Sequence, residues 1–234
     1  MLDITSANAV VAIKNSTLNG LCTVNVAAAG AEVTVDNSTV NCNDNNTTAG
    51  ESYAALCLNK AAVGGSIIAT NTTVNVTAGS DSEKGRNGAE NGTVTINGST
   101  EGVTVTVAVI TYPGSDYYYG FTSLADAIEF AKAGDTITLL ADITASEVIT
   151  IDKSVTINGN GHKVTSSATR VFRVTASDVK VTLNDVNMVS TAVRVGTSDV
   201  RGISIDIVDN VKLTLNNCSV DFTDASANDW AYAV

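Results

Sequence analysis

The residues of this chain whose types could do chemistry are acids, arginines and the one histidine, His162. Hydrolysis of a glycosidic bond needs two carboxylates that face one site. The acids that could converge in this way are Asp178 with Asp185, and Asp199 with Asp206 and Asp209. We interpret these residues as solvated turn acids and His162 as a turn residue. The sequence therefore assigns no catalytic residue.

Two polar insertions, NCNDNN at 41–46 and SDSEKGRNG at 80–88, carry oxygen ligands that suit Ca²⁺. Their acidic members are Asp44, Asp81 and Glu83. Neither insertion matches an EF-hand loop or a glycine-rich nonapeptide repeat. We expect no cofactor, with a structural calcium ion at these three acids as the alternative.

One segment carries a cluster of aromatic residues: it contains Tyr117, Tyr118 and Tyr119 and is followed by Phe121. An aromatic ring can stack on a sugar, and it can equally pack one structural element onto another. These three tyrosines are the candidate ligand-binding residues, and packing is the alternative role.

The cysteines Cys22, Cys42, Cys57 and Cys218 form no C-x-x-C pair. His162 alone offers no zinc-binding partner set. We expect buried thiols, with a Cys22–Cys42 disulfide as the alternative.

Composition excludes two classes of partner. The chain has 24 acidic and 13 basic residues and a net charge of −11, so it lacks the basic surface that neutralises nucleic-acid phosphates. It also has no apolar stretch of about 18 residues, the length that a membrane-spanning helix needs. We therefore expect neither nucleic-acid binding nor membrane insertion.

Most of the chain alternates β-branched and polar residues with a period of two, which predicts short strands separated by Gly, Asn, Asp and Ser turns. One pattern recurs: apolar, any, apolar, polar, Asn or Asp, small, polar, apolar. Its copies are VAIKNSTL (11–18), VTVDNSTV (33–40), IIATNTTV (67–74), VTLNDVNM (181–188) and LTLNNCSV (213–220). Repeated strand–turn–strand units of this kind indicate a solenoid.

The fifth position of each copy is predicted to form a structural ladder. Its residues are Asn15, Asn37, Asn71, Asp185 and Asn217. We expect these side chains to point inward and to hydrogen-bond from one coil to the next. Degenerate copies at 94–98 and 155–161 place Gly98 and Gly159 at the same position.

The repeats VTLNDVNM and LTLNNCSV resemble those of right-handed parallel β-helix proteins, the pectin-lyase-like superfamily. The resemblance implies an all-β fold, a right-handed parallel β-helix solenoid. It does not imply one activity, because this fold carries lyases, hydrolases, phage spikes and adhesins. The galacturonan hydrolases of the superfamily share NTD, DD, GHG and RIK motifs. This chain has none of them, and His162 lies in GHK.

One segment has helical spacing. In FTSLADAIEFAKAGDTITLLADI (121–143), apolar residues recur at intervals of three and four, with Thr122 or Ser123 as N-cap and Gly134 as terminator. We predict a short capping α-helix at about 122–133. The segment ADITASEVITIDKSVTINGNGHKVT that follows resembles the first coils of adhesin-like surface proteins of anaerobic gut bacteria and methanogens.

Three parts are expected along the chain: β-helix coils at 1–110, a hairpin or linker at 111–120, and the cap helix with further coils at 121–234. A cap belongs at the start of a solenoid, yet here it lies in the middle. Joining WAYAV at 230–234 to MLDITSANAVVAIKNSTL at 1–18 gives a passage similar to 52–74. We therefore expect 1–110 to be the C-terminal half of a unit, in a tandem array or a circular permutant, with two unrelated half-solenoids that abut as the alternative.

The acidic, Thr- and Asn-rich composition and the missing catalytic motifs favour a non-catalytic structural or adhesive module. We expect it to belong to a secreted or cell-surface protein whose signal peptide lies outside this chain. Its expected partners are polysaccharides or host or cell-surface proteins, with end-to-end stacking of solenoid units. A polysaccharide lyase or glycoside hydrolase is the first alternative, and a ligand-free spacer is the second.

Overall fold

A computed structural model describes residues 1–43, 53–77, 82–111, 118–193, 199–223 and 231–234. The protein is mostly β-structure and divides into two compact units, Met1–Thr106 and Val107–Val234. The all-β class expected from the sequence is therefore confirmed. The boundary lies before residues 107–110, which the sequence groups with the first coils. These residues instead pair within the second unit.

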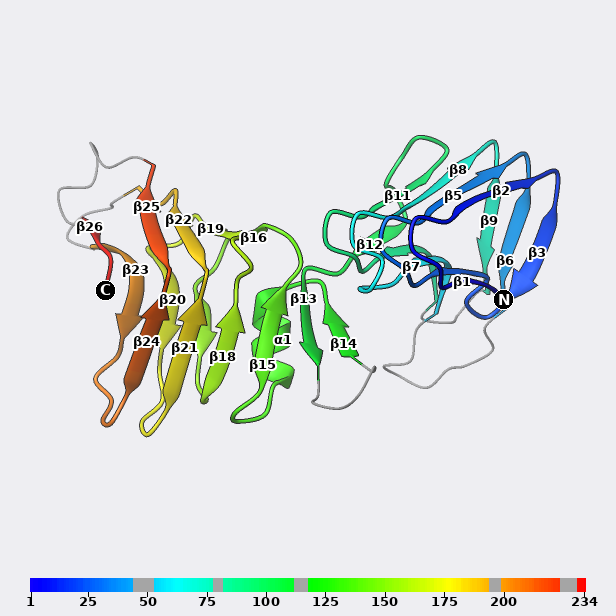
Figure 1. Cartoon of the computed structure of the whole chain (residues 1–234). Helices are drawn as coiled ribbons and strands as arrows, with labels where there is room; N and C mark the ends of the chain where they lie inside the picture. Colours follow the sequence, from blue (N-terminus) through cyan, green and yellow to red (C-terminus); the bar gives the residue numbers. More distant parts are fainter. Residues whose placement is uncertain (44–52, 78–81, 112–117, 194–198, 224–230) are drawn as a thin grey trace. The chain divides into compact units, whose positions relative to one another are not determined.

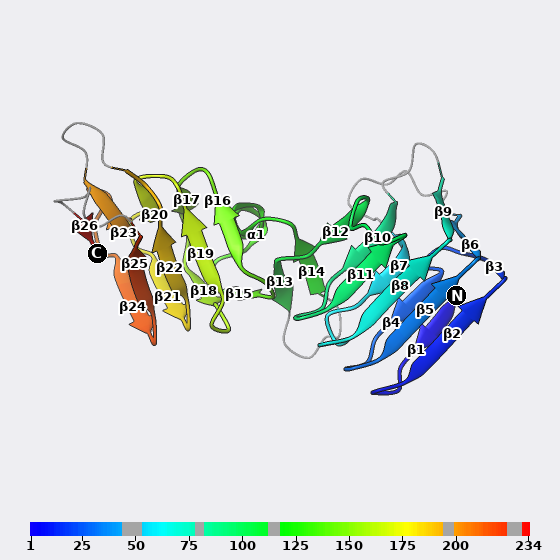
Figure 2. The ribbon, with the colours of Figure 1, turned by 90° about the horizontal axis from the view of Figure 1, so that it is seen from above.

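In the described part of unit 1, the strands form three parallel sheets, and each strand pairs with the third strand after it or before it, apart from the last, β12, which pairs with β10 (Figures 1 and 2). The first sheet contains β1 (Leu2–Ile4), β4 (Val24–Val26), β7 (Ala54–Leu58), β10 (Glu83–Asn87) and β12 (Val103–Val105). The second contains β2 (Val10–Lys14), β5 (Glu32–Asp36), β8 (Ser66–Thr70) and β11 (Thr93–Ile96). The third contains β3 (Thr17–Gly20), β6 (Thr39–Cys42) and β9 (Thr73–Val76).

Unit 2 repeats this connectivity over its described residues. One sheet runs β15 (Thr136–Leu139), β18 (Val155–Asn158), β21 (Lys180–Asn184) and β24 (Lys212–Asn216), which lie side by side in Figure 1. The second runs β16 (Ile143–Ala145), β19 (Lys163–Ser166), β22 (Asn187–Ser190) and β25 (Ser219–Phe222). The third runs β17 (Ile149–Ile151), β20 (Arg170–Val174), β23 (Val200–Ile205) and β26 (Ala231–Tyr232).

An antiparallel hairpin extends the first of these sheets. Its strands are β13 (Ala108–Thr111) and β14 (Tyr118–Phe121), and β13 also pairs antiparallel with β15. The edge of β15 that faces away from β18 is thereby covered. Covering an edge in this way keeps its backbone groups from recruiting another chain.

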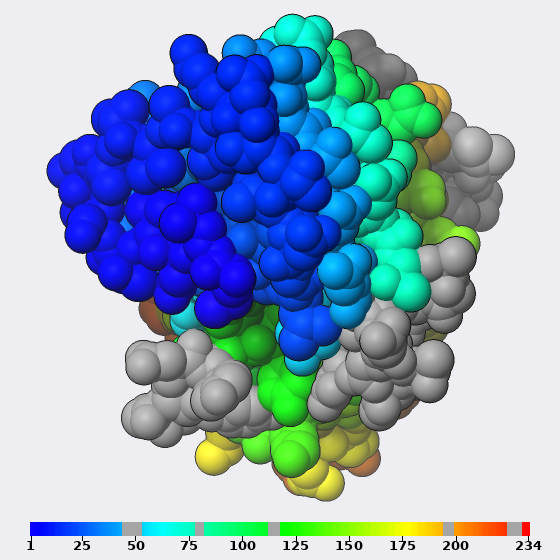
Figure 3. Space-filling model, turned by 90° about the vertical axis from the view of Figure 1, so that its right-hand side faces the viewer, coloured from blue at the N-terminus to red at the C-terminus, as the bar shows by residue number. Residues whose placement is uncertain are grey.

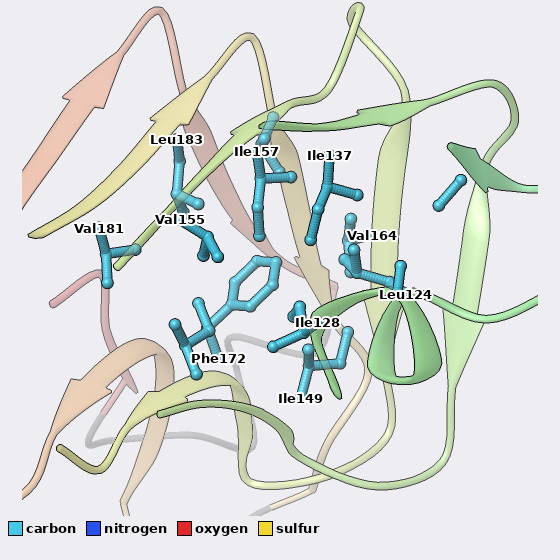
Figure 4. Packing of buried hydrophobic residues seen from close by; sticks show 14 of the residues in the cluster. Leu124, Ile128, Ile137, Ile149, Val155, Ile157, Val164, Phe172, Val181 and Leu183 are labelled. Atoms are coloured by element: carbon cyan, nitrogen blue, oxygen red, sulfur yellow. The ribbon is translucent and has the colours of Figure 1, made fainter. Parts of the chain in front are cut away.

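Period-two alternation explains why these segments are strands. In β5, Val33 and Val35 are fully buried, whereas Glu32 and Thr34 are exposed. The parallel register places like residues above one another, so Val33 pairs with Val11 on one side and Ile67 on the other. Each unit therefore encloses its own column of aliphatic side chains. Figure 4 shows the column of unit 2, with Phe172 as its largest fully buried side chain.

The repeated Asn and Asp residues lie in sharp turns between strands. All five ladder residues have left-handed backbone, with φ between 46° and 52°. Asn and Asp adopt this conformation more readily than other residues that carry a side chain. Two neighbouring pairs are bonded through their side chains: Asn37 Nδ2 donates to Asn15 Oδ1 at 2.7 Å, and Asn217 Nδ2 donates to Asp185 Oδ1 at 2.6 Å.

The inward orientation expected for these side chains is wrong. All five ladder residues are exposed, and the next residue points inward instead, as Ser38 and Thr72 show. Because the Asn or Asp residue has left-handed backbone, the side chain of the residue after it faces the core. In these two coils that residue is a Ser or Thr, and its hydroxyl donates a hydrogen bond to the carbonyl oxygen two residues before it. Ser38 Oγ donates to Asp36 O, and Thr72 Oγ1 donates to Thr70 O.

One of the two glycines assigned to the ladder position serves a different purpose. Gly159 does not have positive φ; Asn160 and Gly161 have it instead. A Cβ on Gly159 would lie 2.3 Å from the carbonyl oxygen of Asp185. Glycine is needed there because the neighbouring coil approaches the backbone closely.

The predicted helix is present but shorter than expected. Helix α1 (Leu124–Phe130) begins after Ser123, whose Oγ accepts a hydrogen bond from the backbone N–H of Asp126. It ends before Gly134, because Ala131 leaves helical conformation and is buried against the core. Leu124 and Ile128 reach the same core as Ile137 and Ile149 (Figure 4). This helix is far too short to cross a membrane, and no other described segment is a helix of spanning length.

Candidate ligand-binding surfaces

A shallow polar groove of about 380 Å³ follows the repeated turns of unit 1. Its lining residues are amides and hydroxyls from three consecutive coils: Asn15, Ser16, Thr17, Asn37, Ser38, Thr39, Asn71 and Thr73. Each coil contributes the left-handed Asn and the Thr that opens the following strand. The repeat that builds the fold therefore also builds the groove.

Parallel pairing sets the spacing of the groups in this groove. Thr17, Thr39 and Thr73 are register partners in β3, β6 and β9, so their side chains recur at the strand spacing of about 4.8 Å. The Asn15–Asn37 hydrogen bond holds two of the amides in line with them. The result is a straight row of neutral donors and acceptors.

The chemistry of this groove suits a neutral, hydroxyl-rich ligand. Amides and hydroxyls both donate and accept hydrogen bonds, and none of the eight lining residues carries a charge. The lining offers no cation to hold a phosphate or carboxylate and no carboxylate to hold a metal. Sequence reasoning had identified the Asn row but had not recognised it as the wall of a groove.

The aromatic residues pack α1 against the hairpin. The rings of Tyr119 and Phe130 lie 4.7 Å apart, and those of Phe121 and Phe130 lie 5.3 Å apart. Tyr118 and Tyr119 belong to β14, and Tyr117 lies outside the described residues. Tyr119 and Phe130 are each about half exposed, so this patch has an outer face as well as a packing role.

Arginine and aspartate side chains form ion pairs on and beside β20 and β23. Arg173 bonds Asp206 at 2.8 Å, and Arg201 bonds Asp199. Arg170 also lies 3.6 Å from Asp199. Arg201 and Asp199 are only two residues apart in the sequence, whereas the pairs Arg173–Asp206 and Arg170–Asp199 join residues about 30 apart and depend on the register of β20 and β23.

These pairings set the protonation behaviour of the cluster. The hydrogen bond from Arg201 lowers the pKa of Asp199, and the bond from Arg173 lowers that of Asp206. The Asp206 carboxylate in turn raises the pKa of Arg173. A general acid near neutral pH needs a raised carboxyl pKa, and an arginine base needs a lowered one. All three shifts oppose that use.

The other acids considered for catalysis do not converge. Asp178 and Asp185 lie at opposite ends of β21, separated by about 20 Å of extended chain. Each carboxylate accepts a hydrogen bond from an asparagine of the next coil, Asn210 or Asn217. Asp209 lies in the coil next to Asp178 and makes two hydrogen bonds through its backbone. Its carbonyl oxygen accepts from Asp178 N, and its N–H donates to Ser177 Oγ.

The residues considered for calcium are only partly described. Asp44 and Asp81 lie outside the described residues. Glu83 belongs to β10, where its Oε2 pairs with Arg86 Nε at 3.0 Å. Among the residues that the structure describes, no three His, Cys, Asp or Glu side chains form a group that could hold a metal ion.

His162 lies in a turn next to β19. Its Nδ1 is 3.2 Å from Asp142 Oδ1, and the backbone N–H of Lys163 donates to the same oxygen at 2.9 Å. That backbone bond, followed by the contact with His162, lowers the pKa of Asp142. The pair links two neighbouring coils.

The four cysteines are free thiols. Cys42 donates to the carbonyl oxygen of Leu21 at 2.8 Å, and the neighbour of the Cys22 thiol is Cys57. The hydrogen bond that Cys22 donates lowers the pKa of Cys57, assisted by Arg86, and the same contact raises the pKa of Cys22. The alternative of a Cys22–Cys42 disulfide is not present.

Comparison of the chain with protein-family models, with curated proteins and with solved structures found no match.

Proposed function

We propose that this chain is a non-catalytic, carbohydrate-binding module of a secreted or cell-surface protein, built from two right-handed parallel β-helix units of the pectin-lyase-like kind. The observation that carries the binding proposal is the neutral groove of unit 1, with its row of Asn and Thr side chains. The role is structural or adhesive: stacked coils hold the groove, and the groove holds a ligand.

The β-helix proposal is supported by the pairing pattern. Apart from β12 and the hairpin β13–β14, strands of one sheet recur as every third strand of the described chain, so one turn of a coil supplies one strand to each of three sheets. Left-handed Asn and Asp residues recur at the same corner. Solenoid folds stack such repeats on their neighbours alone.

A neutral polysaccharide is the ligand that fits this groove best. Its hydroxyls match a lining that both donates and accepts hydrogen bonds. The chain's net charge of −11 disfavours long acidic polysaccharides at low salt. A host or cell-surface protein would reach the same groove through its glycans.

The enzyme alternative, a polysaccharide lyase or glycoside hydrolase, finds less support. Asp199 and Asp206 are ion-paired with arginines, and their lowered pKa values keep them ionised. Asp178 and Asp185 lie at opposite ends of one strand. The ligand-free spacer is the remaining alternative, and it differs from our proposal in a single measurable property, retention by a polysaccharide.

Affinity electrophoresis through gels that contain a neutral galactomannan or acidic polygalacturonate tests the proposal. The groove variant replaces Thr17, Thr39 and Thr73 by Val, which removes three hydroxyls at nearly constant volume. The matched control replaces Thr34, Thr70 and Thr93 by Val. These three residues are exposed on the outer face of β5, β8 and β11. Neither set adds a charge, so migration without polysaccharide should be the same.

We expect the galactomannan to retard the native chain and the control variant, and to leave the groove variant unretarded. Equal retardation of both variants would move the site away from the groove. No retardation by either polysaccharide would favour the spacer, and new reducing or unsaturated ends in the gel would favour the enzyme.

A further inference from the structure

Each unit ends in a coil whose strands have a neighbour on one side only, within the residues that the structure describes. In unit 2 these strands are β24 and β25, and in unit 1 they are β2 and β3. Figure 3 looks onto the end of unit 1, where residues of β1–β3 (blue) form the facing surface. Both ends present backbone groups and incompletely buried aliphatic side chains: Leu215 is 37% exposed, and Val11 and Ile13 are half-buried.

We propose that these two ends bind each other between copies of this chain, so that β24–β25 of one copy pair in parallel with β2–β3 of a second copy. The proposal rests on the coil geometry of the proposed function. One constant register aligns both strand pairs: Lys212 with Val10 at one end, and Phe222 with Gly20 at the other. It places Asn217 over Asn15, as the ladder of each unit requires.

The apolar positions match in this register. Leu213 meets Val11, Leu215 meets Ile13, and Val220 meets Leu18 of the second copy. Apart from Leu215, whose exposure is given above, each of these residues is half-buried in its own unit and packs against the end of that unit's core. Pairing would join the two aliphatic columns and remove the remaining apolar surface from water.

The polar ladders match as well, and they have a direction. In the Asn–Asn and Asn–Asp side-chain bonds between coils of the described residues, the later coil donates Nδ2 and the earlier coil accepts through Oδ1. Asn15 and Asn19 already use Oδ1 as acceptors within unit 1. These two bonds do not use the Nδ2 donors of Asn15 and Asn19. The proposed register aligns them with the acceptors of Asn217 and Asp221.

The backbone pattern continues in the same way. Between the coil of β21–β22 and the coil of β24–β25, Asp185 N donates to Asn216 O, and Ser219 N donates to Val186 O. The corresponding bonds at the new contact run from Asn217 N to Lys14 O of the second copy, and from Thr17 N of the second copy to Cys218 O. Side chains, ladder and backbone therefore select the same register, and a second copy supplies all three.

The contact joins two different surfaces of the chain, so it is heterologous and can extend into a linear assembly. This predicts complementation between two blocked variants. Leu215→Lys places a charge on the β24–β25 end and leaves the β2–β3 end intact. Val11→Lys does the reverse. Ile68→Lys, on the outer face of the inner strand β8, is the matched control.

Sedimentation velocity at increasing protein concentration measures the assembly. We expect the native chain and Ile68→Lys to form a growing series of species, each single end variant to remain monomeric, and an equimolar mixture of Leu215→Lys with Val11→Lys to stop at a dimer. A native chain that stays monomeric up to its solubility limit would overturn the proposal. So would a mixture without dimer, or assembly of either end variant alone.

A milder variant keeps the test decisive if a lysine prevents folding. Asn15→Asp retains the acceptor for Asn37 but loses the donor for Asn217 of the second copy. We expect about a fivefold weaker association, the effect of one lost hydrogen bond. Unchanged association would contradict the ladder contact. Retention of monomeric Leu215→Lys by galactomannan separates this proposal from the groove, because Leu215 does not line it.

Discussion

Replacing Phe172 by Ala should destabilise unit 2 and leave unit 1 unchanged. Phe172 is fully buried and lies in register between Ile149 and Ile203. Figure 4 shows its ring among aliphatic side chains from several coils. Truncating a buried phenylalanine to alanine costs about 3–5 kcal/mol, since the removed atoms leave a cavity that rigid neighbours fill only in part. The stacked strands on either side leave little freedom to collapse.

Hydrogen–deuterium exchange with peptide-level mass spectrometry measures this effect in each unit separately. We expect the slowest-exchanging amides of unit 2 to lose about 3–5 kcal/mol of protection. Peptides of unit 1 should keep theirs, because their core cluster is a separate set of residues. Ile205→Ala, at an exposed position of β23, serves as the control and should cost under about 1 kcal/mol. A loss below about 1 kcal/mol for Phe172→Ala would refute the packing described here.

Three further changes test other contacts. Ser38→Ala removes the acceptor of the Ser16 N–H bond at 3.1 Å and should cost unit 1 about 1–3 kcal/mol in urea unfolding; an unchanged midpoint would contradict the inward hydroxyl. The pKa of Asp142 is lowered below its ordinary 3.8 in the folded state. Its carboxylate therefore stabilises the folded protein above that pH, and this stabilisation is lost as the pH falls through the folded-state pKa. Asp142→Asn should therefore lower the melting temperature at pH 7 but not in strong acid, and a pH-independent difference would count against this. Iodoacetamide at neutral pH should label Cys57, whose pKa is lowered, before the buried Cys42, as peptide mass spectrometry would show.

Local sequence signals predicted the elements of this fold well. Alternating residues such as those at 32–36 identify strands, because one face of each strand is buried. Ser123 and the apolar spacing after it identify the start of α1. The predicted end of α1 was wrong. The helix ends at Phe130, where the buried Ala131 leaves helical conformation, before the glycine signal at Gly134.

Contacts that depend on strand register could not be predicted from the sequence. The antiparallel pairing of β13 with β15 joins segments of one sheet in opposite directions, and nothing in their composition distinguishes it from parallel pairing. The same holds for the ion pair of Arg173 with Asp206, whose partners belong to different coils. The orientation of the ladder side chains also failed, because a single left-handed residue shifts which neighbour faces inward.

The polar groove of unit 1 depends both on the repeat in the sequence and on the register of the strands. The sequence identified a row of Asn residues at coil spacing, which is a one-dimensional pattern. The groove also needs the Thr residues that open β3, β6 and β9, and these become a wall only once the strands are in register. A search for Asn-x-Thr at every coil would have found both components.

The most direct test of the central claim is incubation of the native chain with neutral and acidic polysaccharides, with and without calcium, while retention and product release are followed together. The account predicts binding to a neutral polysaccharide with no new reducing or unsaturated ends. Product release would contradict it and establish an active coil, and the absence of any binding would contradict the role given to the groove.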